Sequence, residues 1–126
     1  MIQFHVVGSP RTKKNSNRLV NGKRSILPSR AWSYWCEYAV FIIPGKGGFR
    51  LQPPAWDHTV PCSINAQFYL DADNHADAVN LYQGLGDLLQ ARLCFPDDNI
   101  LRDWDGSRVH VDRQNPRVEV TLKPAV

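Results

Sequence analysis

Apolar and polar residues alternate in four short stretches of the chain, and this pattern predicts half-buried β-strands at those places. The alternating apolar residues of the first stretch are Ile2, Phe4 and Val6. Those of the longest, central stretch are Ile64, Ala66, Phe68, Leu70 and Ala72. The last two stretches, near the C-terminus, contain Val109 and Val111, then Val118, Val120 and Leu122.

Two further segments show the spacing of three and four that is typical of amphipathic helices. The first follows Ser29, a good N-cap residue, and its apolar stripe is Trp32, Trp35, Ala39 and Ile42. A stripe of this kind usually faces a core. The second helix is expected to begin at Asn74, and Gly84 and Gly86 predict a weak point in its middle. Its apolar residues are Val79, Tyr82, Leu85 and Leu89.

Between the first strand and the first helix, residues 11–27 are polar and predict a loop or loose hairpin that turns at Asn21-Gly22. A chain of 126 residues suits one domain. The order of strands and helices predicts an α+β fold for residues 1–126, with helices packed on a mixed sheet.

Charge is distributed unevenly along the chain. The first 36 residues carry seven basic side chains and no acidic ones, whereas the rest carry eight basic and twelve acidic ones. A basic segment beside an acidic one suits an enzyme that holds a polyanion and binds cations where it cuts, although a solvated basic loop fits equally well. The basic residues are Arg11, Lys13, Lys14, Arg18, Lys23, Arg24 and Arg30.

The remaining composition narrows the class of protein. Three cysteines without a CxxC pair argue against a disulfide framework or a zinc knuckle, and indicate buried thiols in a reducing cytoplasm. No apolar run approaches the length of a membrane span, and the N-terminus lacks the pattern of a secretory signal. The four histidines have no ligand spacing. A cytoplasmic location is therefore expected.

Acidic residues supply the candidate chemistry. Asp71 and Asp73 lie two residues apart on the predicted central strand, so their carboxylates would share its polar face, with Cα atoms roughly 6.6 Å apart. Mg²⁺ takes oxygen ligands of this kind, but a solvated strand end explains the pair too. A second acidic pair, Asp97-Asp98, by itself indicates a turn. If these acids met in space, they could hold Mg²⁺ and activate a water molecule against a phosphodiester.

Three stretches together resemble the RusA-type Holliday junction resolvases, or crossover junction endodeoxyribonucleases. They are Gly8–Ser16 after the first strand, Asp71–Asn74 after the central strand, and Asp97–Ile100 before the last strands. The order and spacing match over essentially the whole chain. The resemblance implies an α+β homodimer that places two active sites on opposed strands of a four-way DNA junction during recombination or repair.

The same resemblance implies a cofactor and a set of site residues. The cofactor is Mg²⁺, with Mn²⁺ as a substitute, and its ligands and catalytic residues are Asp71, Asp73 and Asp98. Asp97 would be an accessory or a turn residue. We expect the basic segment to grip DNA phosphates, which positions the duplex without reading its sequence.

The chain departs from the family pattern at one position. The pattern has a lysine four residues after the second aspartate, and Asp77 stands there instead. Asp77 is interpreted as an acid favouring the start of the second helix, or as an accessory metal ligand. Lys13 or Lys14 could replace the lysine, and Asn80 or Asp87 a further acid of the pattern. The alternatives are a catalytically impaired junction-binding protein and an unrelated metal-binding domain without a nucleic-acid partner.

Overall fold

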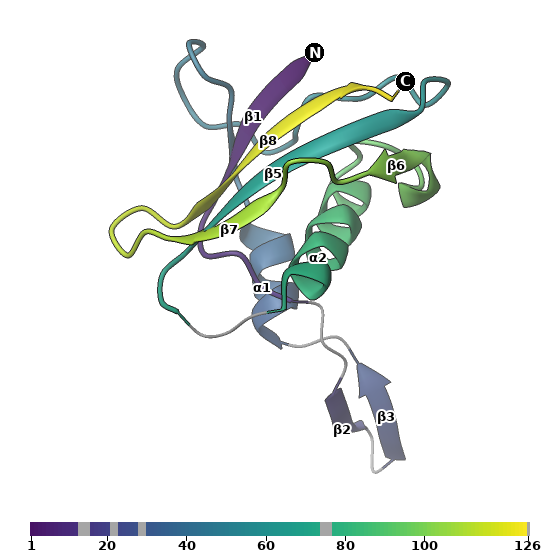
Figure 1. Ribbon diagram of the computed structural model, residues 1–126. Helices are drawn as coiled ribbons and strands as arrows, with labels where there is room; N and C mark the ends of the chain where they lie inside the picture. The colour runs from purple at the N-terminus through teal and green to yellow at the C-terminus, as the bar shows by residue number, and fades with distance from the viewer. Residues whose placement is uncertain (13–15, 21–22, 28–29, 74–76, 126) are drawn as a thin grey trace.

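The computed structural model describes residues 1–12, 16–20, 23–27, 30–73 and 77–125, and has an α+β architecture (Figure 1). The two helices, the six strands of the main sheet and a separate hairpin account for its regular structure. In chain order the elements are β1 (Ile2–Val7), β2 (Ser16–Val20), β3 (Lys23–Leu27), α1 (Arg30–Tyr38), β4 (Phe41–Ile42), β5 (Cys62–Leu70), α2 (Ala78–Ala91), the 3₁₀ turn η1 (Asp98–Ile100), β6 (Leu101–Asp103), β7 (Arg108–Val111) and β8 (Arg117–Pro124).

The main sheet is mixed, as the sequence predicts. Its strands follow the order β4-β1-β8-β5-β6, and β7 pairs with β5 beyond the short β6. β6 and β7 run parallel to β5, whereas the pairs β1–β4, β1–β8 and β5–β8 are antiparallel. β5 therefore lies inside the sheet, with β8 along one of its edges and β6 and β7 along the other.

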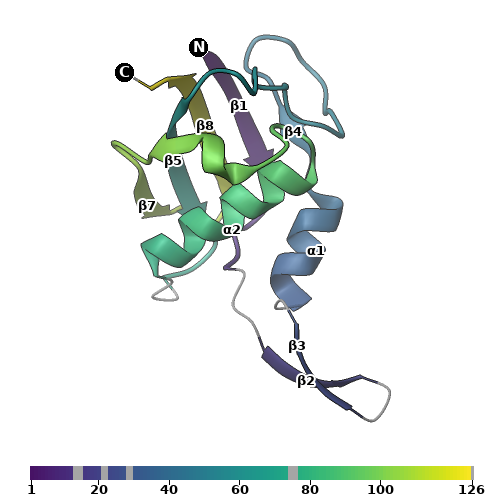
Figure 2. The same ribbon diagram turned by 90° about the vertical axis from the view of Figure 1, so that its right-hand side faces the viewer.

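Both helices cover the same face of this sheet (Figure 2). The alternating apolar residues of the strands point toward them, and Phe4, Phe68 and Val118 are fully buried. Trp32 and Trp35 of α1 complete the core from the helical side. Burial raises the pKa of the Cys62 thiol to about 11 and that of the Cys94 thiol to about 12, so neither is a reactive thiolate near neutral pH.

Several element boundaries differ from the sequence predictions. α1 ends at Tyr38 instead of continuing to Ile42, because residues 41–42 pair with β1 as strand β4. The run Val40–Ile43 is aromatic and β-branched, which favours a strand once a partner edge is present. α2 begins at Ala78, after the N-cap Asp77, and is continuous through Gly84 and Gly86, both of which are buried; Asn74, the predicted start, lies outside the described residues. Strand β6 was not predicted.

A two-stranded hairpin forms from β2 and β3, as the sequence predicts, with Val20 paired to Lys23. It projects from the body of the protein beyond the N-terminal ends of the two helices (Figures 1 and 2). The predicted turn at Asn21-Gly22 and the predicted N-cap at Ser29 lie outside the described residues.

The two buried tryptophans of α1 differ in hydrogen bonding, which gives a test of the packing. Trp32 Nε1 donates to Gly84 O at 2.9 Å, whereas Trp35 Nε1 has no partner among the described residues. We expect Trp32→Phe to lower the free energy of unfolding by about 1–2 kcal/mol more than Trp35→Phe, because only the former removes a buried hydrogen bond. Urea denaturation of both variants measures the difference. Equal losses would contradict the assigned bond.

Candidate active site

The carboxyl ends of the parallel strands β5 and β7 meet at one edge of the molecule. Leu70, the last residue of β5, pairs with Val111, the last residue of β7. Asp71 and Asp112 follow these two strands directly, and Asp112 N–H donates to Leu70 O at 2.8 Å. In open sheets with parallel strands, ligands bind outside the carboxyl ends of those strands. The predicted acidic pair, Asp71 and Asp73, follows β5 at this edge.

Asp71 and Asp73 lie together at this edge, but not on the strand. β5 ends at Leu70, so both acids belong to the segment that leaves the sheet, and the predicted sharing of a strand face is wrong. The Asp71 carboxylate lies 3.9 Å from the guanidinium of Arg11, with both side chains about two-fifths exposed (44% and 40%). Asp73 is exposed. Exposed pairs such as Arg11–Asp71 contribute little to stability, and the exposure of the Asp71 side chain leaves its carboxylate accessible to a ligand.

The backbone of residue 98 lies at the other end of β5 from Asp71 and Asp73. Residue 98 begins η1, three residues before Leu101, and Leu101 pairs with Cys62 at the opposite end of β5. The nine residues of β5 span roughly 26 Å of extended strand. Within one chain, the backbone of residue 98 is thus far from Asp71 and Asp73, because α2 carries the backbone back along the sheet before residue 98 is reached. That the three carboxylates share one metal stays a prediction.

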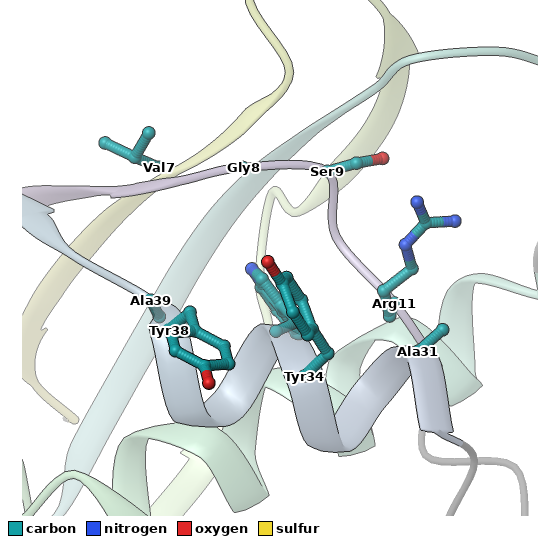
Figure 3. Close-up of a pocket in the computed structure, with 9 residues that line it drawn as sticks. Val7, Gly8, Ser9, Arg11, Ala31, Tyr34, Tyr38 and Ala39 are labelled. Carbon is teal, nitrogen blue, oxygen red and sulfur yellow. The ribbon is translucent and has the colours of Figure 1, made fainter.

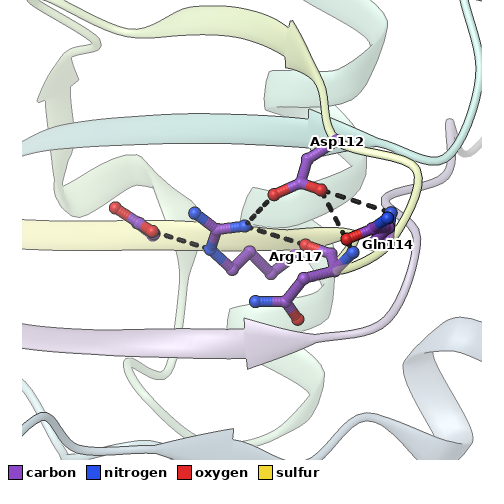
Figure 4. Close-up of polar contacts among 5 residues, drawn as sticks. Asp112, Gln114 and Arg117 are labelled. Carbon is purple, nitrogen blue, oxygen red and sulfur yellow. Dashed lines mark hydrogen bonds and ion pairs between the residues drawn. The ribbon is translucent and has the colours of Figure 1, made fainter.

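Asp112 is the acid that the fold brings next to β5 instead, and the sequence analysis did not select it. Its carboxylate accepts hydrogen bonds from Arg117 Nη1 at 3.0 Å and from the backbone N–H groups of Gln114 and Asn115 at 3.2 Å (Figure 4). The hydrogen bond from Arg117, above all, holds the pKa of Asp112 below its ordinary value. The sequence does show that Asp112 directly follows a predicted strand. The parallel pairing of that strand with β5, which places Asp112 at this edge, was not predictable from the sequence.

Arg117 is also committed to neighbouring groups on the open face of the sheet. Its Nε donates to Glu119 Oε2 at 2.7 Å, and its guanidinium lies 3.9 Å from the centre of the Tyr69 ring. Asp112 is therefore neutralised by an arginine that two acids share. Among the described residues, no three His, Cys, Asp or Glu side chains are grouped so that they could hold a metal ion.

The two accessory acids have local structural roles. Asp77 is the N-cap of α2, and its carboxylate accepts from Val79 N at 2.8 Å. The interpretation of Asp77 as an acid at the helix start is confirmed, although it precedes the helix instead of lying within its first turn. Asp97 Oδ1 accepts from Asn99 N at 3.0 Å, as a turn residue does.

The cap predicts a measurable effect of substituting Asp77. Asp77→Ala should lower the free energy of unfolding by about 1 kcal/mol, because it leaves a helix N–H without its partner. Asp77→Asn should cost much less, because asparagine caps about as well as aspartate. Thermal unfolding of the two variants measures the difference, and an equal loss in both would mean that the charge matters more than the cap.

The basic residues are placed unevenly by the described structure. Arg11 lies beside Asp71, Arg30 is exposed at the first position of α1, and the hairpin strands include Arg18, Lys23 and Arg24. Lys13 and Lys14 lie outside the described residues. The hairpin thus extends the basic segment outward from the body of the protein (Figure 1).

Comparisons with known proteins identify no relative. Neither protein-family models, nor curated proteins, nor solved structures give a match to this chain. No described helix has the length and apolar character needed to cross a membrane.

Proposed function

We propose that this protein is a Mg²⁺-dependent, structure-selective endonuclease that resolves four-way junctions or other branched DNA and acts as a homodimer. The observation that carries the proposal is the pair Asp71 and Asp73 directly after β5, with Arg11 of the basic segment beside Asp71. Acids and cations that are far apart in the sequence are adjacent here, as an enzyme that cuts a polyanion requires.

The donor set at this edge fits Mg²⁺. This ion binds oxygen ligands and commonly uses only one or two protein carboxylates, while water and phosphate oxygens complete its shell. Asp71 and Asp73 would hold it, and the bound ion would polarise the phosphodiester and lower the pKa of a water molecule. Arg11 would contribute separately by contacting a phosphate and by balancing the charge on Asp71.

The homodimer is proposed because two cuts across one junction need two sites, and a C2 pair supplies both through one interface. We propose the first helix, with the segment up to Ile43, as a wall of that interface as well as of the core. Trp32 and Trp35 are buried within their own chain, which confirms the core role. Tyr34 and Tyr38 are the aromatic residues that α1 leaves exposed.

A catalytically impaired junction-binding protein is the second candidate, and one observation favours it. The backbone of Asp98 lies at the far end of β5, and Asp77, at the family's lysine position, is occupied as a helix cap. In that case the basic segment would bind DNA while the acidic edge would lack the groups needed for hydrolysis.

A labelled four-way junction separates the two candidates. The nuclease should cut it in Mg²⁺ or Mn²⁺ and not in EDTA, whereas the binding protein should retard it in EDTA without cutting in either metal. Binding should weaken with salt, with a slope of roughly −0.9 for each phosphate contact on the duplex arms. Lys13→Ala and Lys14→Ala should each flatten that slope by about one unit. Salt-independent binding, or none, would contradict both candidates.

A further inference from the structure

A small cavity lies between the end of β1 and the side of α1 that faces it. Its volume is about 200 Å³. Val7, Gly8 and Ser9 form one wall, α1 forms the other, and Arg11 lies at one end with Tyr34 and Tyr38 along the helix (Figure 3). Binding sites for drug-sized ligands measure roughly 300–1,000 Å³, so this cavity suits a single ring system.

Two polar atoms of this cavity are buried and unsatisfied. Among the described residues, Ser9 Oγ and Trp35 Nε1 are the buried side-chain polar atoms without a hydrogen-bond partner, and both residues line the cavity. Trp35 is only 5% exposed. A Cβ on Gly8 would lie 4.0 Å from Trp35 Nε1, so the N–H edge of the indole faces that wall. A buried donor without a partner is costly, and such exceptions call for an explanation.

The residues that line the cavity also determine which chemical groups a ligand must have. Trp35 Nε1 can only donate, so the ligand must present an acceptor, while the Ser9 hydroxyl can donate or accept. The exposed ring of Tyr34, 67% accessible, offers an aromatic wall. Arg11 adds a cation at one end of the cavity. All the lining residues come from the first 39 residues of the chain, in which Glu37 is the only acid, so the surroundings favour an anionic ligand. A flat ring with acceptors and an attached anion meets every one of these conditions.

We propose that this cavity holds one unstacked nucleobase of a DNA strand, with the adjoining phosphate on Arg11. The base would accept a hydrogen bond from Trp35 Nε1 and contact the ring of Tyr34, since every base has both an acceptor edge and a π-face. Arg11 contacts Asp71 at 3.9 Å, so the seated nucleotide would lie next to the acidic edge. In this respect the inference rests on the proposed function and narrows its substrate to DNA with an unpaired base.

Tryptophan indole N–H signals test this proposal directly. Selective ¹⁵N labelling gives four indole signals, one for each tryptophan, and Trp35→Phe identifies that of Trp35. Titration with thymidine 5′-monophosphate in EDTA should shift the Trp35 signal saturably, with a Kd on the order of 1 mM. Titration with 2-deoxyribose 5-phosphate, which has no base, should leave it in place. No shift, or the same shift with both compounds, would overturn the base site.

A substitution that fills the cavity provides a second test of the proposal. Ala31 is exposed and lines the cavity, and Ala31→Leu keeps a good helix former while filling the space. The matched control is Ala55→Leu, at an exposed alanine that does not line the cavity. We expect Ala31→Leu to weaken mononucleotide binding about tenfold or more, the scale of one lost base contact, and Ala55→Leu to leave it unchanged. Equal behaviour of the two variants would overturn the proposal.

The two proposals can fail separately. Mononucleotide binding is measured in EDTA, so it persists if the protein binds DNA without cutting it. Conversely, Mg²⁺-dependent cutting of a junction by the unmodified protein, with no response of the Trp35 signal to thymidine 5′-monophosphate, would reject the base site and leave the nuclease intact.

Discussion

Asp73→Asn is expected to lower the rate of Mg²⁺-dependent junction cleavage about 10³-fold, or about 4 kcal/mol in activation free energy. The substitution removes a charged metal ligand but keeps the shape of the side chain. The bound metal stabilises negative charge that develops in the transition state, so its loss affects the rate far more than the binding. Junction affinity in EDTA should stay the same or increase, because one negative charge near the phosphates is gone. Single-turnover cleavage and gel retardation measure the two quantities.

Asp98→Asn is the matched control for this prediction. The same chemical change is made in an acid that the fold places at the other end of β5. We expect its cleavage rate to stay within about threefold of the unmodified protein, a difference of less than 1 kcal/mol. A loss as large as that of Asp73→Asn would contradict a site built within one chain, and would require Asp98 from a second copy to complete it.

Phe68→Ala is expected to lower the free energy of unfolding by about 3–5 kcal/mol, the usual cost of truncating a buried phenylalanine. Phe68 is fully buried on the central strand, and its ring stacks on Tyr82 of α2 with 5.6 Å between the ring centres. The alanine variant loses both the transfer free energy of the ring and its contacts with the helix. Since small domains are stable by only about 5–15 kcal/mol, much of the variant could be unfolded at 37 °C. Urea denaturation followed by circular dichroism measures the loss.

Val79→Ala provides the comparison for the core prediction. Val79 lies on α2, as Tyr82 does, but its side chain is 68% exposed. Alanine is also the better helix former, so we expect a change within about 0.5 kcal/mol in either direction. A large loss in Val79→Ala would mean that this surface of α2 is covered by another molecule in solution.

Local patterns along the chain were sufficient to predict most of the elements. Alternation at Ile2–Val6, Ile64–Leu70 and Val118–Leu122 predicts β1, β5 and β8. The local sequence is sufficient here because the side chains of a strand alternate between the two faces of its sheet. The α+β class with a mixed sheet follows from the order of these elements and is confirmed. The hairpin of β2 and β3 was also predicted, since a polar segment around Asn-Gly favours it.

Boundaries that depend on a distant partner were predicted less well. Residues 39–43 continue a helical stripe in the sequence, yet β1 offers an unpaired edge and takes Phe41 and Ile42 as β4. Gly84 and Gly86 have poor helix propensity, but α2 is continuous because the packing around them outweighs it. Gly86 lies against Leu101 and Trp104, which a Cβ would contact at 3.8 Å. Neither neighbour can be inferred from the local sequence.

For the candidate site, the sequence by itself determined which residue types are present and that Asp71 and Asp73 stay together, because only Ala72 separates them along the chain. Only the tertiary structure decided which other acid lies near them. The direction in which α2 runs and the parallel pairing of β7 with β5 place Asp112 beside Asp71 and carry Asp98 to the opposite end. Strand pairing is a long-range interaction, whereas periodicity reports only on neighbours, so spacing in the sequence cannot specify which strand ends meet.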